Sequence, residues 1–131
     1  MTIKKSIVGS MFSMLLVSEM ATADWGDVYY CQMTNYIEIS LEGEKFNYKT
    51  YGTLEKLQFK LDQTKNAMVF GSTGYFEDSV KELTTGWNWP SKEKWYASGT
   101  SSIAYFDEGK FLYTRNGSMG IVSVSADCDK F

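Results

Sequence analysis

Apolar and polar side chains alternate with a period of two along most of the chain, a pattern that is typical of strands with one buried face. The longest alternation covers residues 29–42, with a bend expected at Asn35. The clearest alternation places Leu57, Phe59 and Leu61 on one face and lysine, glutamine or aspartate on the other. Six apolar positions of the first segment share one parity and are expected to face the core together: Tyr29, Cys31, Met33, Ile37, Ile39 and Leu41.

Turn dipeptides separate the alternating segments at short intervals, which is the signature of an antiparallel meander, a barrel or a sandwich. Residues 76–87 are ambiguous, because their apolar spacing fits a short helix whereas Thr84, Thr85 and Gly86 favour a strand. We expect an all-β fold, a single antiparallel meander that closes into a small barrel or sandwich of about eight strands. The expected turns include Glu42-Gly43, Lys65-Asn66, Glu108-Gly109 and Asn116-Gly117.

The N-terminal segment has the three parts of a secretory signal peptide. Lys4 and Lys5 form a short positive region, and residues 7–17 form an apolar run that is too short to span a bilayer. An Ala-x-Ala cleavage site ends at Ala23. We therefore expect a cleaved signal peptide at residues 1–23 and a single all-β domain at residues 24–131, in a periplasmic or secreted protein.

Two cysteines follow this segment, Cys31 and Cys128. Export to an oxidising compartment makes a disulfide the expected state of the pair. Each cysteine shares the parity of the apolar positions in its strand, so both thiols are expected on the core side. A bridge requires the two strands to be close, and the first and last strands of an up-and-down barrel are neighbours.

Composition and charge exclude several functions. The chain has no histidine, which removes histidine-based acid–base catalysis and histidine-ligated zinc. A formal net charge of −3 argues against a nucleic-acid partner, since phosphate contacts need clustered cations. We expect no enzyme activity, no cofactor and no metal. Four acidic residues beside the cysteines are interpreted as solvated chain ends rather than as a calcium site: Asp24, Asp27, Asp127 and Asp129.

No segment after residue 23 is apolar enough for a membrane helix, and the chain ends in Phe131, as outer-membrane barrels often do. Asp127 and Asp129 occupy the alternating positions before it, where such barrels carry apolar residues. The faces opposite the expected core also carry lysine, glutamine and glutamate instead of a lipid-facing belt. A soluble barrel that does not span the membrane is therefore expected.

Aromatic residues gather in one stretch between residues 87 and 96. Flat rings next to amide and hydroxyl groups suit sugar stacking or a protein contact, so the expected partner is a protein or a glycan. The other interpretation, that these rings fill a small core, stays open. The candidate binding surface consists of Trp87, Trp89, Trp95 and Tyr96.

The order of several residues resembles the periplasmic C-type lysozyme inhibitors, which are small disulfide-bonded β-barrels. The resemblance is carried by Tyr29, Cys31, Gly71, Ser72, Tyr75, Trp95, Gly99 and Cys128. Where the family has a Gly-Ser-Gly turn, this chain has four residues, and serine replaces the lysine that precedes the later glycine. The resemblance implies an inhibitory loop made of Gly71, Ser72, Thr73, Gly74 and Tyr75.

Taken together, these patterns predict a small exported, non-enzymatic β-barrel that acts as a binding module for an unidentified ligand. The alternative function is a periplasmic inhibitor of a hydrolase. A lipocalin-like carrier would need an apolar cavity, whereas an inhibitor would combine a filled barrel with an exposed rigid loop.

The exported protein is expected to begin at Asp24 and to carry no free thiol. Intact mass, measured with and without an alkylating reagent, checks both expectations. Retention of residues 1–23, or two cysteines that react without a reductant, would contradict them.

Overall fold

The computed structural model describes residues 23–52, 54–84 and 94–131. All regular elements in these ranges are strands, and every pairing between them is antiparallel. The strands are β1 (Val28–Glu42), β2 (Lys45–Thr50), β3 (Lys56–Asp62), β4 (Ala67–Phe70), β5 (Val80–Glu82), β6 (Lys94–Ser98), β7 (Ser102–Asp107), β8 (Lys110–Gly117) and β9 (Gly120–Lys130).

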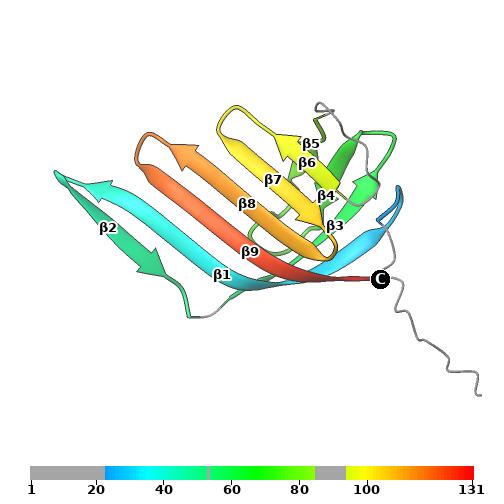
Figure 1. Ribbon diagram of the computed structural model, residues 1–131, viewed down its shortest axis with the longest axis horizontal. Coiled ribbons are helices and arrows are strands. Elements are labelled where there is room, and N and C mark those ends of the chain that lie inside the picture. The colour runs from blue at the N-terminus through cyan, green and yellow to red at the C-terminus, as the bar shows by residue number, and fades with distance from the viewer. Residues whose placement is uncertain (1–22, 53, 85–93) are drawn as a thin grey trace, which may run out of the picture.

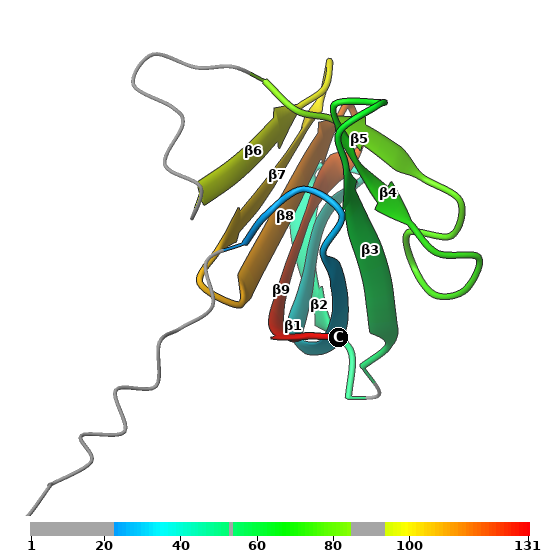
Figure 2. The same ribbon diagram turned by 90° about the vertical axis from the view of Figure 1, so that its right-hand side faces the viewer.

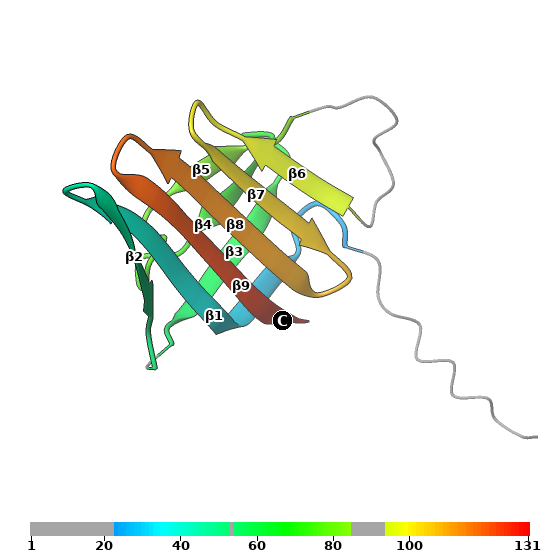
Figure 3. The ribbon, with the colours of Figure 1, turned by 60° about the vertical axis from the view of Figure 1, so that its left-hand side comes forward.

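Eight strands curve into a nearly closed barrel in the order β5-β4-β3-β1-β9-β8-β7-β6, so the expected all-β barrel is confirmed (Figure 2). The ends of this order meet at Thr84, directly after β5, whose amide donates to the carbonyl of Tyr96 in β6 at 2.9 Å. The Thr84 hydroxyl also lies 2.8 Å from that of Ser98. Strand β2 lies off this path and pairs only with the second half of β1, forming a hairpin that projects from the barrel (Figures 1 and 3).

The disulfide joins the first and last strands as expected. Cys31 and Cys128 are directly opposite each other in the register of β1 and β9 and are bonded to each other. Near the same end, Lys130 forms an ion pair with Asp27, with 2.9 Å between Nζ and Oδ2. A disulfide fits an oxidising compartment, because such bonds persist there.

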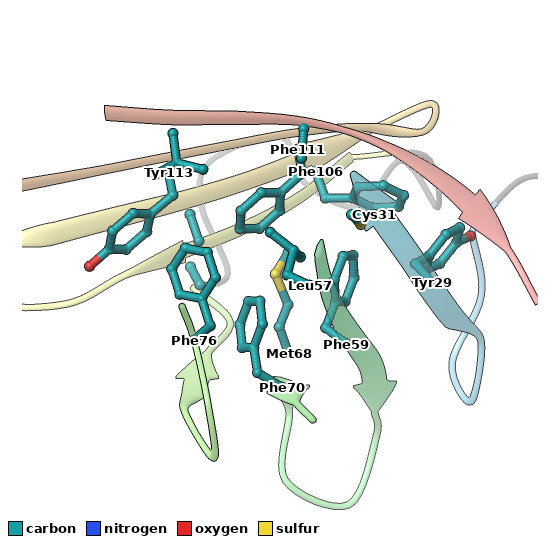
Figure 4. Packing of buried hydrophobic residues seen from close by; sticks show 14 of the residues in the cluster. Tyr29, Cys31, Leu57, Phe59, Met68, Phe70, Phe76, Phe106, Phe111 and Tyr113 are labelled. Atoms are coloured by element: carbon teal, nitrogen blue, oxygen red, sulfur yellow. The ribbon is translucent and has the colours of Figure 1, made fainter. Parts of the chain in front are cut away.

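Aromatic rings occupy the interior of the barrel (Figure 4). Phe59 from β3, Phe106 from β7 and Phe111 from β8 are almost completely buried. The Phe59 ring centroid lies 5.2 Å from that of Phe106 and 5.8 Å from that of Phe111. Phe70 and Phe76 extend this cluster toward the loop between β4 and β5. The alternation of β3 is therefore confirmed, with Leu57, Phe59 and Leu61 all buried.

The second half of β1 differs from the expected parity because the strand contains a β-bulge. The register to β9 shifts between Met33 and Asn35, so that Tyr36 lies opposite the buried Val124. One extra residue turns every later side chain to the other face of the sheet. The expectation that Ile37, Ile39 and Leu41 share the core face with Tyr29 is therefore wrong.

The last hairpin also differs from expectation. Asn116 and Gly117 belong to β8, and Gly117 pairs with Gly120, which leaves Ser118 and Met119 as the two-residue turn. Gly120 has a φ of 156°, and a Cβ atom there would overlap the carbonyl oxygen of Ile39. The close approach of β1 therefore requires glycine at the start of β9.

The ambiguous segment at residues 76–87 and the expected signal peptide at residues 1–23 are each only partly described. Residues 80–82 form β5, so this part of the 76–87 segment is a strand. Of the expected signal peptide, residues 1–22 lie outside the described residues, and Ala23 is buried against the core at 5% exposure. Within the described ranges, no helix of the length and hydropathy needed to cross a membrane occurs.

Removal of the Phe59 ring tests the barrel core. Phe59 is 0% exposed, so Phe59→Ala should lower the free energy of unfolding by about 3–5 kcal/mol through a large cavity. Phe46→Ala in the projecting hairpin is the control, because Phe46 is 75% exposed and its loss should cost less than about 0.5 kcal/mol. Urea unfolding that gave the two variants equal stability would contradict the register of β3.

Candidate functional site

The loop that the sequence suggested as inhibitory connects β4 and β5 and is held in place by backbone hydrogen bonds. The amide of Gly71 donates to the carbonyl of Gln58, and the amide of Asp78 donates back to Gly71. Gly74 has a φ of 91°, and a Cβ atom there would lie 2.5 Å from the carbonyl oxygen of Lys56. Ser72, Thr73 and Gly74 are exposed at the tip of this loop.

The aromatic stretch is only partly described. Trp87 and Trp89 lie outside the described residues. Trp95 is half-buried and packs edge-to-face on Trp25, with ring centroids 4.8 Å apart. Tyr96 lies on the opposite face of β6 from Trp95 and pairs across the strands with Tyr105. The two described members of the candidate surface therefore do not form a common platform.

A pocket of about 190 Å³ lies where the linker between β2 and β3 passes the bend of β1. Its wall combines three segments that are distant in the sequence: the bulged part of β1, the described linker residues Tyr51, Leu54 and Glu55, and the loop after β4. Three of its residues are tyrosines. The lining residues are Met33, Tyr36, Tyr51, Leu54, Glu55 and Tyr75.

The three tyrosine rings form a corner instead of a stack. The Tyr36 centroid lies 4.8 Å from that of Tyr51, and the two ring planes are inclined at 86°. On its other side, Tyr36 lies 5.6 Å from Tyr75 at an angle of 74°. Tyr75 in turn packs edge-to-face on the buried Phe76, at 4.9 Å. The pocket is therefore a direct extension of the aromatic core.

Side-chain and backbone hydrogen bonds hold the linker wall against β1. The side-chain amide of Gln32 donates to the carbonyls of Leu54, at 3.2 Å, and of Glu55, at 3.4 Å. The backbone amide of Met33 donates to the carbonyl of Glu55 at 3.0 Å. These bonds use the main chain of Glu55, so they leave its carboxylate available at the exposed rim of the pocket.

The pocket environment stabilises neutral tyrosine. Burial raises the pKa of Tyr36 to about 12, with further contributions from the neighbouring Tyr75 hydroxyl and from the negative charge of Glu38. Burial, with a contribution from Tyr75, also raises the pKa of Tyr113. Glu38 lies close to the site, because the Tyr51 hydroxyl donates to its Oε2 at 3.4 Å.

Two of the four acidic residues beside the disulfide, Asp27 and Asp127, lie in ion pairs. Asp27 pairs with Lys130, and Asp127 pairs with Lys110 at 2.6 Å. The backbone amide of Asp24 donates to Asp27 Oδ2 at 2.8 Å. Across the described ranges, no group of three or more histidine, cysteine, aspartate or glutamate side chains is placed to hold a metal ion.

A second hollow, of about 270 Å³, lies beyond Glu38 at the tips of β1, β8 and β9. Arg115 and the turn at Ser118 and Met119 contribute to its lining. None of its described lining residues is aromatic; their side chains are polar or aliphatic. Of the two hollows, the tyrosine pocket therefore offers a ligand more aromatic contact.

The sequence interpretation missed most of this pocket. Tyr75 was included as part of the loop, but Tyr36 had the parity of the polar residues in its strand and so was not placed near the core. The available signal was that Tyr36 interrupts a run of alternate polar positions between Gln32 and Glu42. The bulge explains this exception, because it turns Tyr36 inward.

The protein is a nearly closed antiparallel β-barrel that carries an aromatic pocket beside the bend of its first strand. Comparison of the chain with protein-family models, with curated proteins and with solved structures found no match.

The raised pKa of Tyr36 predicts a pH dependence of stability. The folded state keeps the phenol proton up to about pH 12, whereas an unfolded tyrosine loses it near pH 10. The free energy of unfolding should therefore fall as the pH rises from 10 to 12, and Tyr36→Phe should reduce this fall. Titration of the Tyr36 Cζ resonance by NMR measures the folded pKa. A midpoint near 10 would contradict the raised pKa that the partial burial of Tyr36 and its neighbours produce.

Proposed function

We propose that the protein is an exported, non-enzymatic binding module that holds a small ligand in the tyrosine pocket. The observation that carries this proposal is the corner of three tyrosine rings, which is backed by the packed core and fixed to β1 by hydrogen bonds. Ligand sites are typically concave and apolar, largely preformed, with a few polar groups that set orientation. Here Glu55 and the tyrosine hydroxyls supply the polar groups.

The barrel interior is filled, which favours a ligand site beside the barrel over a carrier cavity within it. Phe59, Phe106 and Phe111 meet near the centre, where a lipocalin-like carrier would need open space. A preformed surface pocket binds with a small ordering cost, because its walls do not rearrange.

Two observations support export. The disulfide between Cys31 and Cys128 persists most readily outside the reducing cytoplasm. Cleavage after Ala23 would also convert the Asp24 amide into a charged amine 2.8 Å from the carboxylate of Asp27, a favourable pair.

A second candidate function is inhibition of a hydrolase by the β4–β5 loop. The observation that favours it is the fixed geometry of an exposed loop, since Gly74 packs on the main chain of Lys56 while Ser72 and Thr73 face solvent. Preorganised loops bind enzymes well because little conformational entropy is lost. The resemblance to C-type lysozyme inhibitors names the first enzyme to test.

The two functions predict different responses in one NMR experiment. The labelled protein is mixed with the low-molecular-mass fraction of the medium in which the producing cells grow, and separately with a C-type lysozyme. We expect the small molecules to shift resonances of Tyr36, Tyr51 and Tyr75, and Tyr51→Leu to weaken this response. The matched control is Tyr48→Leu, a substitution of an exposed tyrosine in β2 outside the pocket, which should change nothing.

Shifts confined to Ser72 and Thr73, together with loss of lysozyme activity, would instead support the inhibitor function. An absence of pocket shifts with the small-molecule fraction would contradict the proposed binding module.

A further inference from the structure

We propose that the tyrosine pocket binds a quaternary ammonium group, the trimethylated nitrogen found in choline-like molecules. This inference rests on the proposed function and names the ligand chemistry of the same site. It follows from four features of the pocket: the arrangement of its rings, its charge, its size and a related contact within the chain.

The ring arrangement presents electron-rich faces in different directions. Tyr36 meets Tyr51 at 86° and Tyr75 at 74°, so a group in the corner contacts rings that are not parallel. A cation within about 6 Å of a ring centroid is attracted by the negative face of the ring, and aromatic corners of this kind recognise quaternary ammonium ligands. A flat sugar or nucleobase would instead be better served by one exposed ring face.

The charge of the pocket favours a cation. Glu55 is the only charged residue among the six described residues that line it, and none of the six is a lysine or arginine. A second carboxylate, that of Glu38, accepts a hydrogen bond from Tyr51 at the edge of the site. An anionic ligand would meet the Glu55 carboxylate with no lysine or arginine among the described lining residues, so the pocket selects against it.

The size and apolar lining favour methyl groups on the cation. The pocket measures about 190 Å³, below the range of roughly 300–1,000 Å³ for sites that enclose drug-sized ligands. Met33 and Leu54 offer apolar contacts but no ligand oxygen. Calcium and magnesium require several oxygen ligands, whereas a methylated ammonium needs apolar and aromatic contact.

The ammonium group of Lys81 already lies against a tyrosine ring next to the pocket. Lys81 Nζ lies 5.4 Å from the centroid of the Tyr113 ring, which itself lies 6.4 Å from the ring of Tyr75. One tyrosine of the aromatic cluster, Tyr113, therefore contacts a cation in the folded protein. The pocket offers the same chemistry at its open corner, between Tyr36, Tyr51 and Tyr75.

Calorimetric titration with choline tests the inference. The comparison ligand is the uncharged alcohol in which a carbon atom replaces the nitrogen, because it has the same shape without the charge. We expect choline to bind at least about tenfold more tightly, since shape and apolar contact are equal and only the attraction to rings and carboxylate differs. Equal binding of the alcohol, or no binding of choline, would overturn the inference.

Variants separate the contribution of the ring from that of the hydroxyl. Tyr51 is 48% exposed, so its replacement leaves the core intact. Tyr51→Phe should retain choline binding, whereas Tyr51→Leu should weaken it by roughly 2- to 30-fold, the range for the loss of one ring–cation contact. Glu55→Gln should also weaken it while preserving the main-chain bonds of the linker. Tyr48→Leu is the control and should bind choline as the parent does. Equal affinity in Tyr51→Leu and the parent would overturn the assignment to this pocket.

Quaternary ammonium groups occur on dissolved molecules and on lipid head groups, and sedimentation with phosphatidylcholine vesicles distinguishes these sources. Choline binding with the protein left in the supernatant assigns the group to a dissolved ligand. Co-sedimentation that free choline reverses supports the same chemistry on a lipid. If choline fails while the small-molecule fraction of the medium still shifts the pocket tyrosines, the cation inference is wrong and the proposed binding function stands.

Discussion

A single β-bulge in the first strand decides how the rest of the molecule is arranged. Thr34 and Asn35 both lie against Ser125 of β9, with 2.9 Å between the hydroxyls of Thr34 and Ser125 and 3.1 Å from Asn35 Nδ2 to Ser125 Oγ. Two residues therefore face one, and the strand changes parity at that point. Before the bulge β1 contributes Cys31 and Met33 to the core, and after it Tyr36 faces inward while Ile37 faces out. The pocket depends on this change, because it turns Tyr36 toward Tyr51 and Tyr75.

The disulfide and the aromatic core keep the bulged strand in place. Cys31 is bonded to the residue directly opposite it in β9, and the buried Phe76 supports Tyr75 from below. Gln32 fixes the linker wall through its side-chain amide. Each wall of the pocket thus comes from a different segment, yet each is tied to the barrel by at least one contact that is already present without a ligand. Such preorganisation is what allows a small site to bind without a large entropic cost.

The barrel could be anticipated from the sequence because several of its strands follow a period of two. In β3 and β9 the buried residues are those the alternation indicates, and the parity of Cys31 and Cys128 placed the bridge between the first and last strands. The pocket could not be anticipated, because a bulge is one residue of irregular pairing that depends on the partner strand. Tyr36 has the parity of the outward-facing residues before the bulge, and the bulge turns it inward. The corner of rings also needs residues from three separate segments of the chain. These segments come close to one another only in the folded barrel.

Nuclear Overhauser contacts of Tyr36 test the central claim, that the bulge turns this residue into the pocket. The account predicts contacts from the Tyr36 ring to the rings of both Tyr51 and Tyr75, with Ile37 showing contacts only to outward-facing neighbours such as Thr50. Contacts from Ile37 to the buried Val124, with none between Tyr36 and Tyr75, would show an unbulged strand and contradict the account.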